Sequence, residues 1–196
     1  MPLEDELIAR GVWPLCGVDE AGRGPLAGPV VAAAVIMEPS SALRSSVKDS
    51  KQLTAARREK LYEMLVSSDD VRFGTSIVEA PAIDAMNILK ATLMAMEEAV
   101  GRLRITPSAA LVDGNAAPAV ACRCYTVVKG DQTEPSISAA SIIAKVTRDR
   151  IMARMEEIYP GYGFARHKGY PTKDHYEAIH RLGACPIHRR SFKGVS

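Results

Sequence analysis

The segment Gly17-Val18-Asp19-Glu20-Ala21-Gly22-Arg23-Gly24-Pro25 joins an apolar run beginning at Leu15 to a turn of glycine, arginine and glycine. Asp19 and Glu20 therefore enter the turn as adjacent carboxylates, directly from an expected strand. The glycines on either side of Arg23 lack Cβ atoms, so a bulky ligand can approach the backbone closely. Because carboxylate oxygens are ligands for Mg²⁺, the segment predicts a metal-dependent phosphodiester site.

The rest of the chain predicts one continuous α/β domain over residues 1–196. Apolar runs rich in Val, Ile and Ala, bounded by Gly and Pro, predict strands at 15–20, 28–37, 71–78, 109–113 and 124–128. Apolar periodicity predicts helices at 54–66, around 89–100, at 138–158 and at 172–182. The helix around 89–100 rests on a stripe of Leu89, Leu93, Met96 and Val100. This order of elements favours a mixed sheet with helices on its faces, followed by a basic C-terminal helical and loop element from about residue 160.

The composition narrows the class of protein. With 196 residues and 47% hydrophobic content, the chain can fill one core. The first residues, MPLEDELIARG, are acidic, and the longest apolar run, Leu26–Met37, is short and contains Pro29. We therefore expect no export signal, no membrane partner and a cytoplasmic location.

The four cysteines, Cys16, Cys122, Cys124 and Cys185, have no spacing typical of a disulfide framework. Reduced thiols are the simple expectation. A zinc site made by Cys122, Cys124, Cys185 and His188 is an alternative, although C-x-C is unusual spacing for such a site.

Charge is unevenly distributed along the chain. Residues 145–196 hold 11 Lys and Arg against 5 Asp and Glu, a local +6, whereas residues 1–144 have a local charge of −4. All four histidines also lie in the basic part. This asymmetry favours a polyanionic partner, although a basic tail can also be only a solvated surface.

Four acids lie at the expected ends of strands, where α/β sheets usually hold their ligands: Asp19, Glu20, Asp113 and Asp131. If they converge, their mutual repulsion raises their pKa values unless divalent cations bind between them. Asp113-Gly114 and Gly130-Asp131 can also be simple turns. Side chains alternate along a strand, so Asp19 and Glu20 share a metal only if the strand twists or if Glu20 uses its backbone carbonyl.

A second group of residues suits nucleic acid. Ser141, Lys145 and Arg148 follow one another at i, i+4 and i+7, which predicts a polar stripe on the long helix beside the acids. Lys51 is a further candidate phosphate contact, and Tyr170 precedes a proline in a segment suited to stacking on a sugar or base. Each feature alone can equally be surface or loop structure. A dinucleotide site is excluded because the glycine pattern is G-x-x-x-x-G-x-G and an apolar strand follows it.

Together these segments resemble ribonuclease HII, the type 2 ribonuclease H family. The resemblance runs from Gly17 to about Phe192 through eight motifs in the family's order: DEAGRGPLAGPV, DSKQL, IDAMNILKAT, LVDGN, VVKGD, SAASIIAKVTRD, YGFARHKGYPT and HRRSF. It implies a ribonuclease H-like fold with a five-stranded mixed sheet flanked by helices. It also implies cleavage of the RNA strand of RNA/DNA hybrids and incision beside single ribonucleotides in duplex DNA.

The resemblance also assigns roles to residues. It implies that the four acids bind two Mg²⁺ or Mn²⁺ ions while water attacks the phosphorus in line, leaving 5′-phosphate and 3′-hydroxyl ends. It implies that Gly22, Arg23 and Gly24 contact the ribose 2′-hydroxyl and that Tyr170 senses the junction between RNA and DNA. The family's contacts with the nucleic-acid backbone correspond to Lys51, Asn87, Ser141, Lys145 and Arg148. The chain departs from the family pattern at Gln132, where serine is frequent.

Two other hypotheses are consistent with parts of the sequence. One is another nuclease of the same fold class, such as a junction resolvase, that uses similar acids without recognising the 2′-hydroxyl. The other is a non-catalytic nucleic-acid-binding module whose acids are turn residues. We expect a monomer, since no long exposed apolar stripe is evident.

Overall fold

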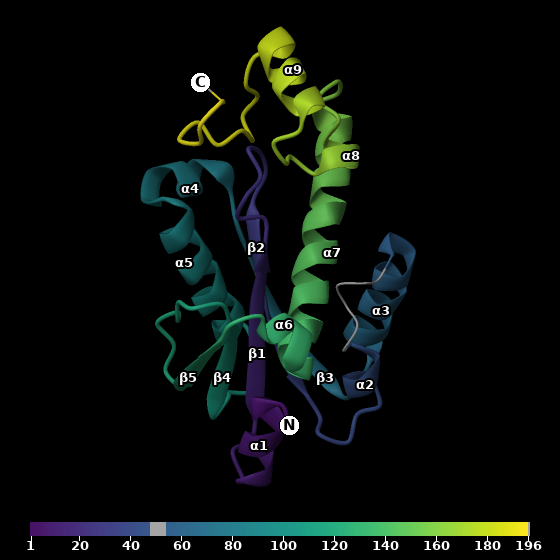
Figure 1. Ribbon diagram of the computed structural model, residues 1–196, viewed down its shortest axis with the longest axis vertical. Coiled ribbons are helices and arrows are strands. Elements are labelled where there is room, and N and C mark those ends of the chain that lie inside the picture. The colour runs from purple at the N-terminus through teal and green to yellow at the C-terminus, as the bar shows by residue number, and fades with distance from the viewer. Residues whose placement is uncertain (48–53, 196) are drawn as a thin grey trace.

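The computed structural model describes residues 1–47 and 54–195 (Figure 1). The strands form one mixed sheet in the order β3-β2-β1-β4-β5. Their bounds are β1 Leu15–Ala21, β2 Val30–Met37, β3 Val71–Val78, β4 Ala109–Asp113 and β5 Arg123–Val127. Neighbours β1, β2 and β3 pair antiparallel, whereas β4 pairs parallel with both β1 and β5. The predicted five-stranded mixed sheet is confirmed.

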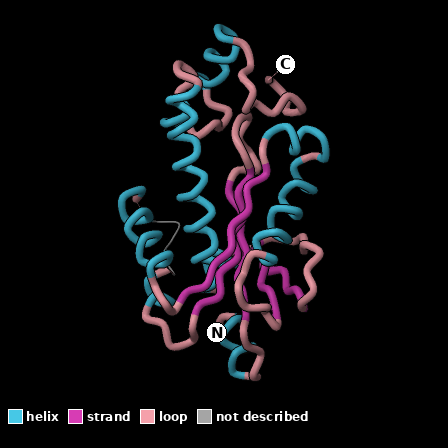
Figure 2. The backbone as a smooth tube through the Cα atoms, turned by 180° about the vertical axis from the view of Figure 1, so that it is seen from behind, coloured by secondary structure: helices cyan, strands magenta, loops and turns pink. Residues whose placement is uncertain are grey.

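Helices cover both faces of this sheet and its upper end (Figures 1 and 2). Their bounds are α1 Leu3–Ala9, α2 Leu43–Ser46, α3 Ala55–Ser67, α4 Ala80–Met86, α5 Ile88–Gly101, α6 Gly130–Thr133, α7 Pro135–Ile158, α8 Phe164–His167 and α9 Lys173–Leu182. Helices α4 and α5 lie on one face, while α3 and α7 lie on the other. The C-terminal helices α8 and α9 extend beyond the sheet at the far end of α7. No helix within residues 1–47 and 54–195 is both long and apolar enough to cross a membrane.

Local chemistry explains most element boundaries. Strands β3 and β4 begin and end at the predicted residues. Strand β2 begins at Val30 rather than residue 28, because Gly28 has a φ of +85° and cannot continue an extended strand. The side chains of Thr54 and Thr172 cap α3 and α9 by accepting backbone N–H bonds from Arg57 and His175. Helix α7 begins at Pro135, three residues before the expected start, because proline suits the first turn of a helix.

The predicted apolar stripe of α5 is only partly correct. Met96 and Val100 are buried, but Leu89 is 46% exposed. Ala91, Ala95 and Ala99 are completely buried in the cluster shared with the sheet. Small residues let the helix backbone approach the strands, so Leu89 lies outside the buried stripe.

The proposed zinc ligands do not come together. Cys122 and Cys124 pack in the cluster between the sheet and α5, near buried Cys16. Cys185 instead lies in the C-terminal cluster with Tyr162 and other apolar residues. All four cysteines are free thiols, which agrees with the simpler expectation.

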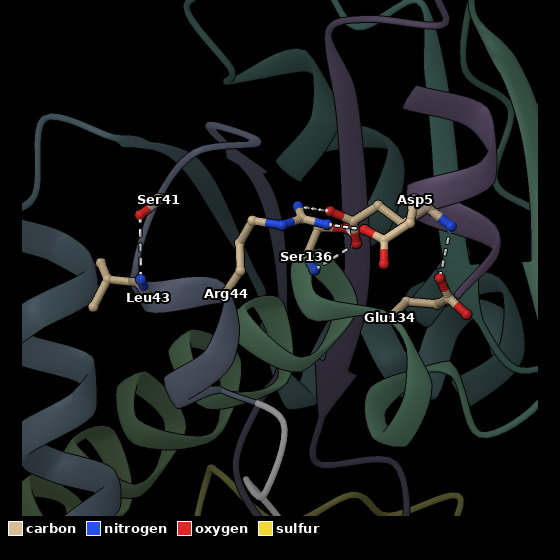
Figure 3. A network of polar contacts seen from close by, with 7 residues as sticks. Asp5, Ser41, Leu43, Arg44, Glu134 and Ser136 are labelled. Atoms are coloured by element: carbon tan, nitrogen blue, oxygen red, sulfur yellow. Dashed lines mark hydrogen bonds and ion pairs between the residues drawn. The ribbon is translucent and has the colours of Figure 1, made fainter. Parts of the chain in front are cut away.

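Helix α1 is tied to the start of α7 by buried polar contacts (Figure 3). The Glu4 carboxylate accepts hydrogen bonds from the backbone N–H and the hydroxyl of Ser136, both at 2.8 Å. Glu134 in turn accepts the backbone N–H of Glu4 at 2.8 Å, in the first turn of α1. Arg44 of α2 forms ion pairs with Glu4 and Asp5. Because carboxylates stabilise helix N-termini, each of α1 and α7 is capped from the other, and the start of α7 is fixed.

The start of α7 also packs closely against Gly17 of β1. A Cβ atom at this position would lie 2.2 Å from the backbone N of Ile137 and 2.2 Å from the carbonyl carbon of Ser136. Backbone atoms cannot move aside as a flexible side chain can. Strand β1 and helix α7 therefore lie so close together that only glycine fits at position 17.

We predict that Gly17→Ala destabilises the fold by about 1–3 kcal/mol or more, because the added methyl group pushes α7 away from β1. The melting temperature should fall by about 2–4 °C per kcal/mol, as measured by calorimetry. Gly101→Ala is the matched control, because a Cβ there meets nothing within 4 Å. It should leave stability unchanged or raise it by up to about 1 kcal/mol. Equal melting temperatures for Gly17→Ala and the wild type would contradict the close contact.

Candidate active site

The four predicted acids lie at one edge of the sheet. Asp19 and Glu20 are near the end of β1, Asp113 ends β4, and Asp131 lies in α6, shortly after β5. The pairing of β1 with β4 reaches Val18 and Val112, directly before Asp19 and Asp113, so these two aspartates lie next to each other on neighbouring strands. The backbone N–H of Asp131 donates to Asp113 Oδ1 at 3.4 Å. Because β1, β4 and β5 run parallel, their carboxyl ends bring together acids from distant parts of the chain.

Asp19 is the most strongly perturbed of these acids. Its side chain is buried, and burial raises the pKa of its carboxyl well above the usual value. The neighbouring carboxylates of Glu20 and Asp113 raise it further, whereas the hydroxyl of Ser141 and the N–H of Glu20 lower it. The bond from the Glu20 N–H to Asp19 Oδ1 is 2.7 Å long. The fold thus holds a negative group where ionisation is costly, a pattern typical of functional sites.

Glu20 occupies the position that the sequence left uncertain. By alternation, Gly17 and Ala21 lie on the α7 side with Asp19, whereas Val18 packs into the cluster on the α5 side. Glu20 nevertheless lines a cavity together with residues of α7, and Arg23 Nη1 approaches its Oε1 at 3.4 Å. Burial raises the pKa of Glu20, and Arg23 opposes that rise. The end of β1 therefore presents side chains of both faces to one site.

The donor set fits divalent cations. All four groups offer oxygen, and burial, with the charge of neighbouring carboxylates, makes ionisation of Asp19 and Glu20 unfavourable without a cation. Within the described part of the chain, no three His, Cys, Asp or Glu side chains are close enough to enclose an ion by themselves. Mg²⁺ commonly uses one or two carboxylates and completes its shell with water and phosphate oxygens. The acids match that open kind of site rather than a closed structural one.

The glycine turn beside the acids is shaped by close contacts. Gly22 has a φ of +102°, and a Cβ there would lie 2.2 Å from Nε of Arg148. A Cβ at Gly24 would instead meet only the Tyr170 ring, at 3.7 Å. Gly22 therefore has a structural requirement for glycine. Gly24 leaves its backbone open toward Tyr170.

Arg148 corrects one of the sequence predictions. It was expected on the exposed stripe with Ser141 and Lys145, but it is completely buried. Its guanidinium donates to the carbonyls of Pro29 at 2.9 Å, Ala27 at 3.1 Å and Lys168 at 3.1 Å. The loop that follows β1 and the segment after α8 both cover this part of α7. Arg148 therefore holds the backbone of that loop in place, and its buried guanidinium is not available to a phosphate.

Arg189 makes a similar set of hydrogen bonds to the same loop, and the sequence did not predict them. It is also fully buried, and it donates to the carbonyls of Gly22 at 2.6 Å, Arg23 at 3.0 Å and Gly28 at 3.0 Å. Burial, with the nearby charge of Arg148, lowers its pKa to about 9. The HRRSF motif contains Arg189, but nothing in its pattern indicates that this side chain points inward.

Glu20 and the glycine turn line a cavity of about 350 Å³. The other three acids, Asp19, Asp113 and Asp131, do not line this cavity. Its other walls include residues 21–24, Ser141 and Lys145 of α7, Tyr170, and Arg58 of α3. Lys145 forms an ion pair with Asp149 at 2.6 Å, and its Nζ lies 6.0 Å from the centre of the Tyr170 ring. Arg58 is a second residue that the sequence analysis missed, since nothing in the helical pattern distinguishes it from Arg57.

The predicted contact Asn87 does not line this cavity. Asn87 joins α4 to α5 with a φ of +75°, and its Oδ1 accepts the backbone N–H of Lys90 at 3.1 Å. Its amide oxygen is thus used to cap α5, while the residue is exposed. Lys51 lies outside the described residues.

Comparison with known sequences resolves the family. The sequence model of ribonuclease HII matches residues 16–195. The chain belongs to the ribonuclease HII family. It is 52% identical over 194 residues to ribonuclease HII of Ruegeria pomeroyi, covering 98% of this chain and 82% of that protein. It is 53% identical over 181 residues to ribonuclease HII of Nitrosococcus oceani, covering 92% of this chain and 89% of that protein. Membership of this family makes the chain a nuclease of the hydrolase class.

Solved structures agree with the observed fold. The ribonuclease H2 of Pyrococcus horikoshii superposes with a TM-score of 0.77 at 32% identity, covering 92% of this chain and 94% of that one. The ribonuclease HII in a PCNA complex from Archaeoglobus fulgidus has a TM-score of 0.79 at 29% identity, covering 91% and 95%. A Bst ribonuclease HIII solved with Mn²⁺ has a TM-score of 0.78 at 20% identity, covering 96% and 70%, and shows the fold alone. The ribonuclease H-like fold class is confirmed.

We predict that Asp19→Asn raises thermal stability in the presence of chelator. The folded pKa of Asp19 lies above its unfolded value, so its ionisation at neutral pH costs folding free energy; that cost is absent below the unfolded pKa and complete above the folded one. An amide of similar shape removes this cost, and the melting temperature should rise by about 2–4 °C per kcal/mol regained.

Calorimetry with Mg²⁺ completes this test. Mg²⁺ should raise the melting temperature of the wild type and have much less effect on Asp19→Asn, because ligand binding to the folded state stabilises it. Asp69→Asn, a change at an exposed aspartate, should alter neither value. A metal-binding role for Asp19 would be contradicted if Mg²⁺ left the melting temperature of the wild type unchanged and Asp19→Asn did not raise the melting temperature in chelator.

Proposed function

We propose that this protein is a metal-dependent endoribonuclease that cleaves the RNA strand of RNA/DNA hybrids and incises beside single ribonucleotides in duplex DNA. The observation that carries the proposal is the position of the glycine turn, between the acid cluster and the Tyr170 ring. A backbone without side chains can approach a ribose closely enough to hydrogen-bond its 2′-hydroxyl, which is the group that distinguishes RNA from DNA. Family membership supports the same substrate class.

The four acids are the proposed holders of two Mg²⁺ or Mn²⁺ ions. Asp19 would give carboxylate oxygens to both ions, Asp113 and Asp131 would each give oxygens to one of them, and Glu20 would support the set. When bound, such ions activate water for in-line attack and stabilise the leaving oxygen, which gives 5′-phosphate and 3′-hydroxyl ends. The raised pKa of Asp19 supports this assignment, because the ionised form is favoured only when a positive charge is close.

Selection of the ribonucleotide is assigned to the two walls of the cavity. The backbone of residues 22–24 forms one wall, and its carbonyls at Gly22 and Arg23 already accept bonds from Arg189, which leaves the turn rigid. The ring of Tyr170, 42% exposed, forms the other wall and can stack on a sugar or base. A rigid turn facing a flat ring fits a ribose better than it fits a small, flexible ligand.

Cations and a hydroxyl around the cavity are the proposed contacts to the phosphates. Ser141 and Lys145 remain in this role, and the side chains of Arg23 and Arg58 join them. Asn87 can contribute only its amide N–H groups while its oxygen caps α5. Lys51 stays a prediction from the sequence. We also propose a monomer that acts in the cytoplasm.

The direct test is incision of a DNA duplex with one embedded ribonucleotide, compared with the same duplex made only of DNA. We expect Mg²⁺- or Mn²⁺-dependent incision of the first, none of the second, and no incision with chelator. Mapping of the ends should give 5′-phosphate and 3′-hydroxyl. Asp19→Asn should abolish incision yet retain binding to the duplex, since the shape of the site persists.

Three outcomes would reject the proposal. Equal cleavage of the all-DNA duplex would indicate a nuclease that ignores the 2′-hydroxyl, such as a resolvase. Binding without any product would indicate a non-catalytic module. Full turnover by Asp19→Asn would remove the proposed chemistry.

A further inference from the structure

Three histidines of the C-terminal element pack together in a cluster that the proposed chemistry does not use, and two of them, His175 and His188, are hydrogen-bonded to each other. His175 and His188 are almost completely buried, and His167 stacks on His175 with ring centres 4.5 Å apart. The ring of Phe164 lies against all three. Buried polar rings surrounded by apolar side chains must have their nitrogens hydrogen-bonded, and the identity of each partner determines where the protons lie.

His188 has its proton on Nε2. Its Nδ1 accepts the backbone N–H of Cys185 at 3.0 Å, and a backbone N–H always donates. The carbonyl of Cys185 is also near Nδ1, at 3.3 Å, but a ring nitrogen that accepts an N–H with its lone pair has no proton to donate to that oxygen. Nδ1 therefore carries the lone pair, and Nε2 donates to Nε2 of His175 at 3.1 Å.

The direction of this bond determines the state of His175. Since its Nε2 accepts from His188, its proton lies on Nδ1, which donates to the carbonyl oxygen of Tyr170 at 3.0 Å. The chain of donors therefore runs from His188 through His175 to the backbone of Tyr170. His167 makes a separate pair of bonds: its Nδ1 accepts the N–H of Gly169 at 3.1 Å, and its Nε2 donates to the carbonyl of Tyr162 at 2.7 Å.

His188, the first donor in this series of hydrogen bonds, is also paired through its backbone with the loop that follows the glycine turn. The backbone of His188 forms an antiparallel bridge with Ala27, flanked by the bonds Gly28 N–H to Ile187 O and Arg189 N–H to Leu26 O, both 2.8 Å. His188 is thus connected through its backbone to the segment that directly follows the glycine turn, which forms one wall of the cavity. Its ring is connected, through His175, to the other wall at Tyr170.

We propose that His188 and His175 are positioning residues that set the place of Tyr170 relative to the glycine turn. We call the hydrogen bonds from His188 through His175 to the Tyr170 carbonyl the relay. Its direction is fixed, because the reverse direction would require a proton on Nδ1 of His188, where it would clash with the N–H of Cys185. The proposal rests on the proposed function in one respect, namely that Tyr170 contacts the ribonucleotide. Neither histidine touches substrate, so both act through Tyr170.

The surroundings keep the relay uncharged at neutral pH. Burial lowers the pKa of His188 to about 4, with smaller contributions from His175, Arg190 and His167, while the Cys185 backbone opposes the change. Burial also lowers the pKa of His175. The other titratable groups at the cluster are the Cys185 thiol, 3.1 Å from Nδ1 of His188, and Tyr162, whose hydroxyl donates to Gly183 O at 2.7 Å.

The first test needs no activity. Nitrogen-15 NMR of the imidazoles in the full-length wild type at pH 7 reports which ring nitrogen bears the proton. We expect the Nδ1–H form for His175 and the Nε2–H form for His188 and His167. The Nε2–H form at His175, or a charged ring at either relay position, would overturn the proposal even if the protein incised nothing.

The second test uses kcat/KM for incision at a single ribonucleotide. His175→Leu removes the donor and should lower kcat/KM about tenfold, within the range for losing one stacking contact. His175→Asn places an amide N–H near the position of Nδ1 and should restore most of the loss. In a Tyr170→Ala background, His175→Leu should have no further effect, because the relay acts only through Tyr170.

The matched control is His180→Leu, at the exposed histidine of the same helix, which should leave kcat/KM unchanged. If the His175→Leu loss is as large with Tyr170→Ala as with Tyr170 present, a general structural role replaces the relay. Unchanged kcat/KM for His175→Leu also overturns it. A wild type that does not incise the substrate rejects the proposed function instead, and the NMR result then decides the relay separately.

Discussion

Two buried arginines hold the segment between β1 and β2, and the geometry of the site depends on them. Arg148 and Arg189 together donate to five carbonyls of residues 22–29, and a sixth bond from Arg148 reaches Lys168. Among the described residues, no carboxylate lies within ion-pair distance of either guanidinium. Burial of a charge is costly unless hydrogen bonds replace water, and here backbone carbonyls provide them. The glycine turn thereby gains a fixed shape, although glycine alone favours flexibility.

This constraint explains why the C-terminal element belongs to the site. Leu26 N–H donates to Gly169 O, and Arg189 N–H donates to Leu26 O, so the loop after the glycine turn is paired through its backbone with both Gly169 and Arg189. The acids depend on a different contact, the close approach of β1 and α7 at Gly17, which α1 supports from outside the matched family range. The acids and the glycine turn are thus held by different contacts, which meet near Glu20.

The sequence predicted the sheet, most helices and the family, because strand composition, turn residues and ordered motifs are local signals. It could not predict the burial of Arg148, because helical spacing places it near the stripe of Ser141 and Lys145, while the loop that covers it, at Pro29, comes from 119 residues earlier. Arg189 and Arg58 were missed for the same reason: their roles arise from tertiary contacts. Leu89 was assigned to the core although alanines occupy the closest positions to the sheet. The fold places Asp19 and Asp113 side by side, whereas the binding of ions and the contacts of Lys51 and Asn87 stay predictions.

Hydrogen exchange in Arg189→Lys tests the central claim most directly. Lysine cannot present three N–H groups in the planar fork that reaches Gly22, Arg23 and Gly28. We predict that the amides of Leu26 and Gly28, which donate to Gly169 O and Ile187 O, exchange at least about tenfold faster, while amides between β1 and β4 keep their protection. Unchanged protection at Leu26 and Gly28 would contradict the claim that the buried arginines hold this loop.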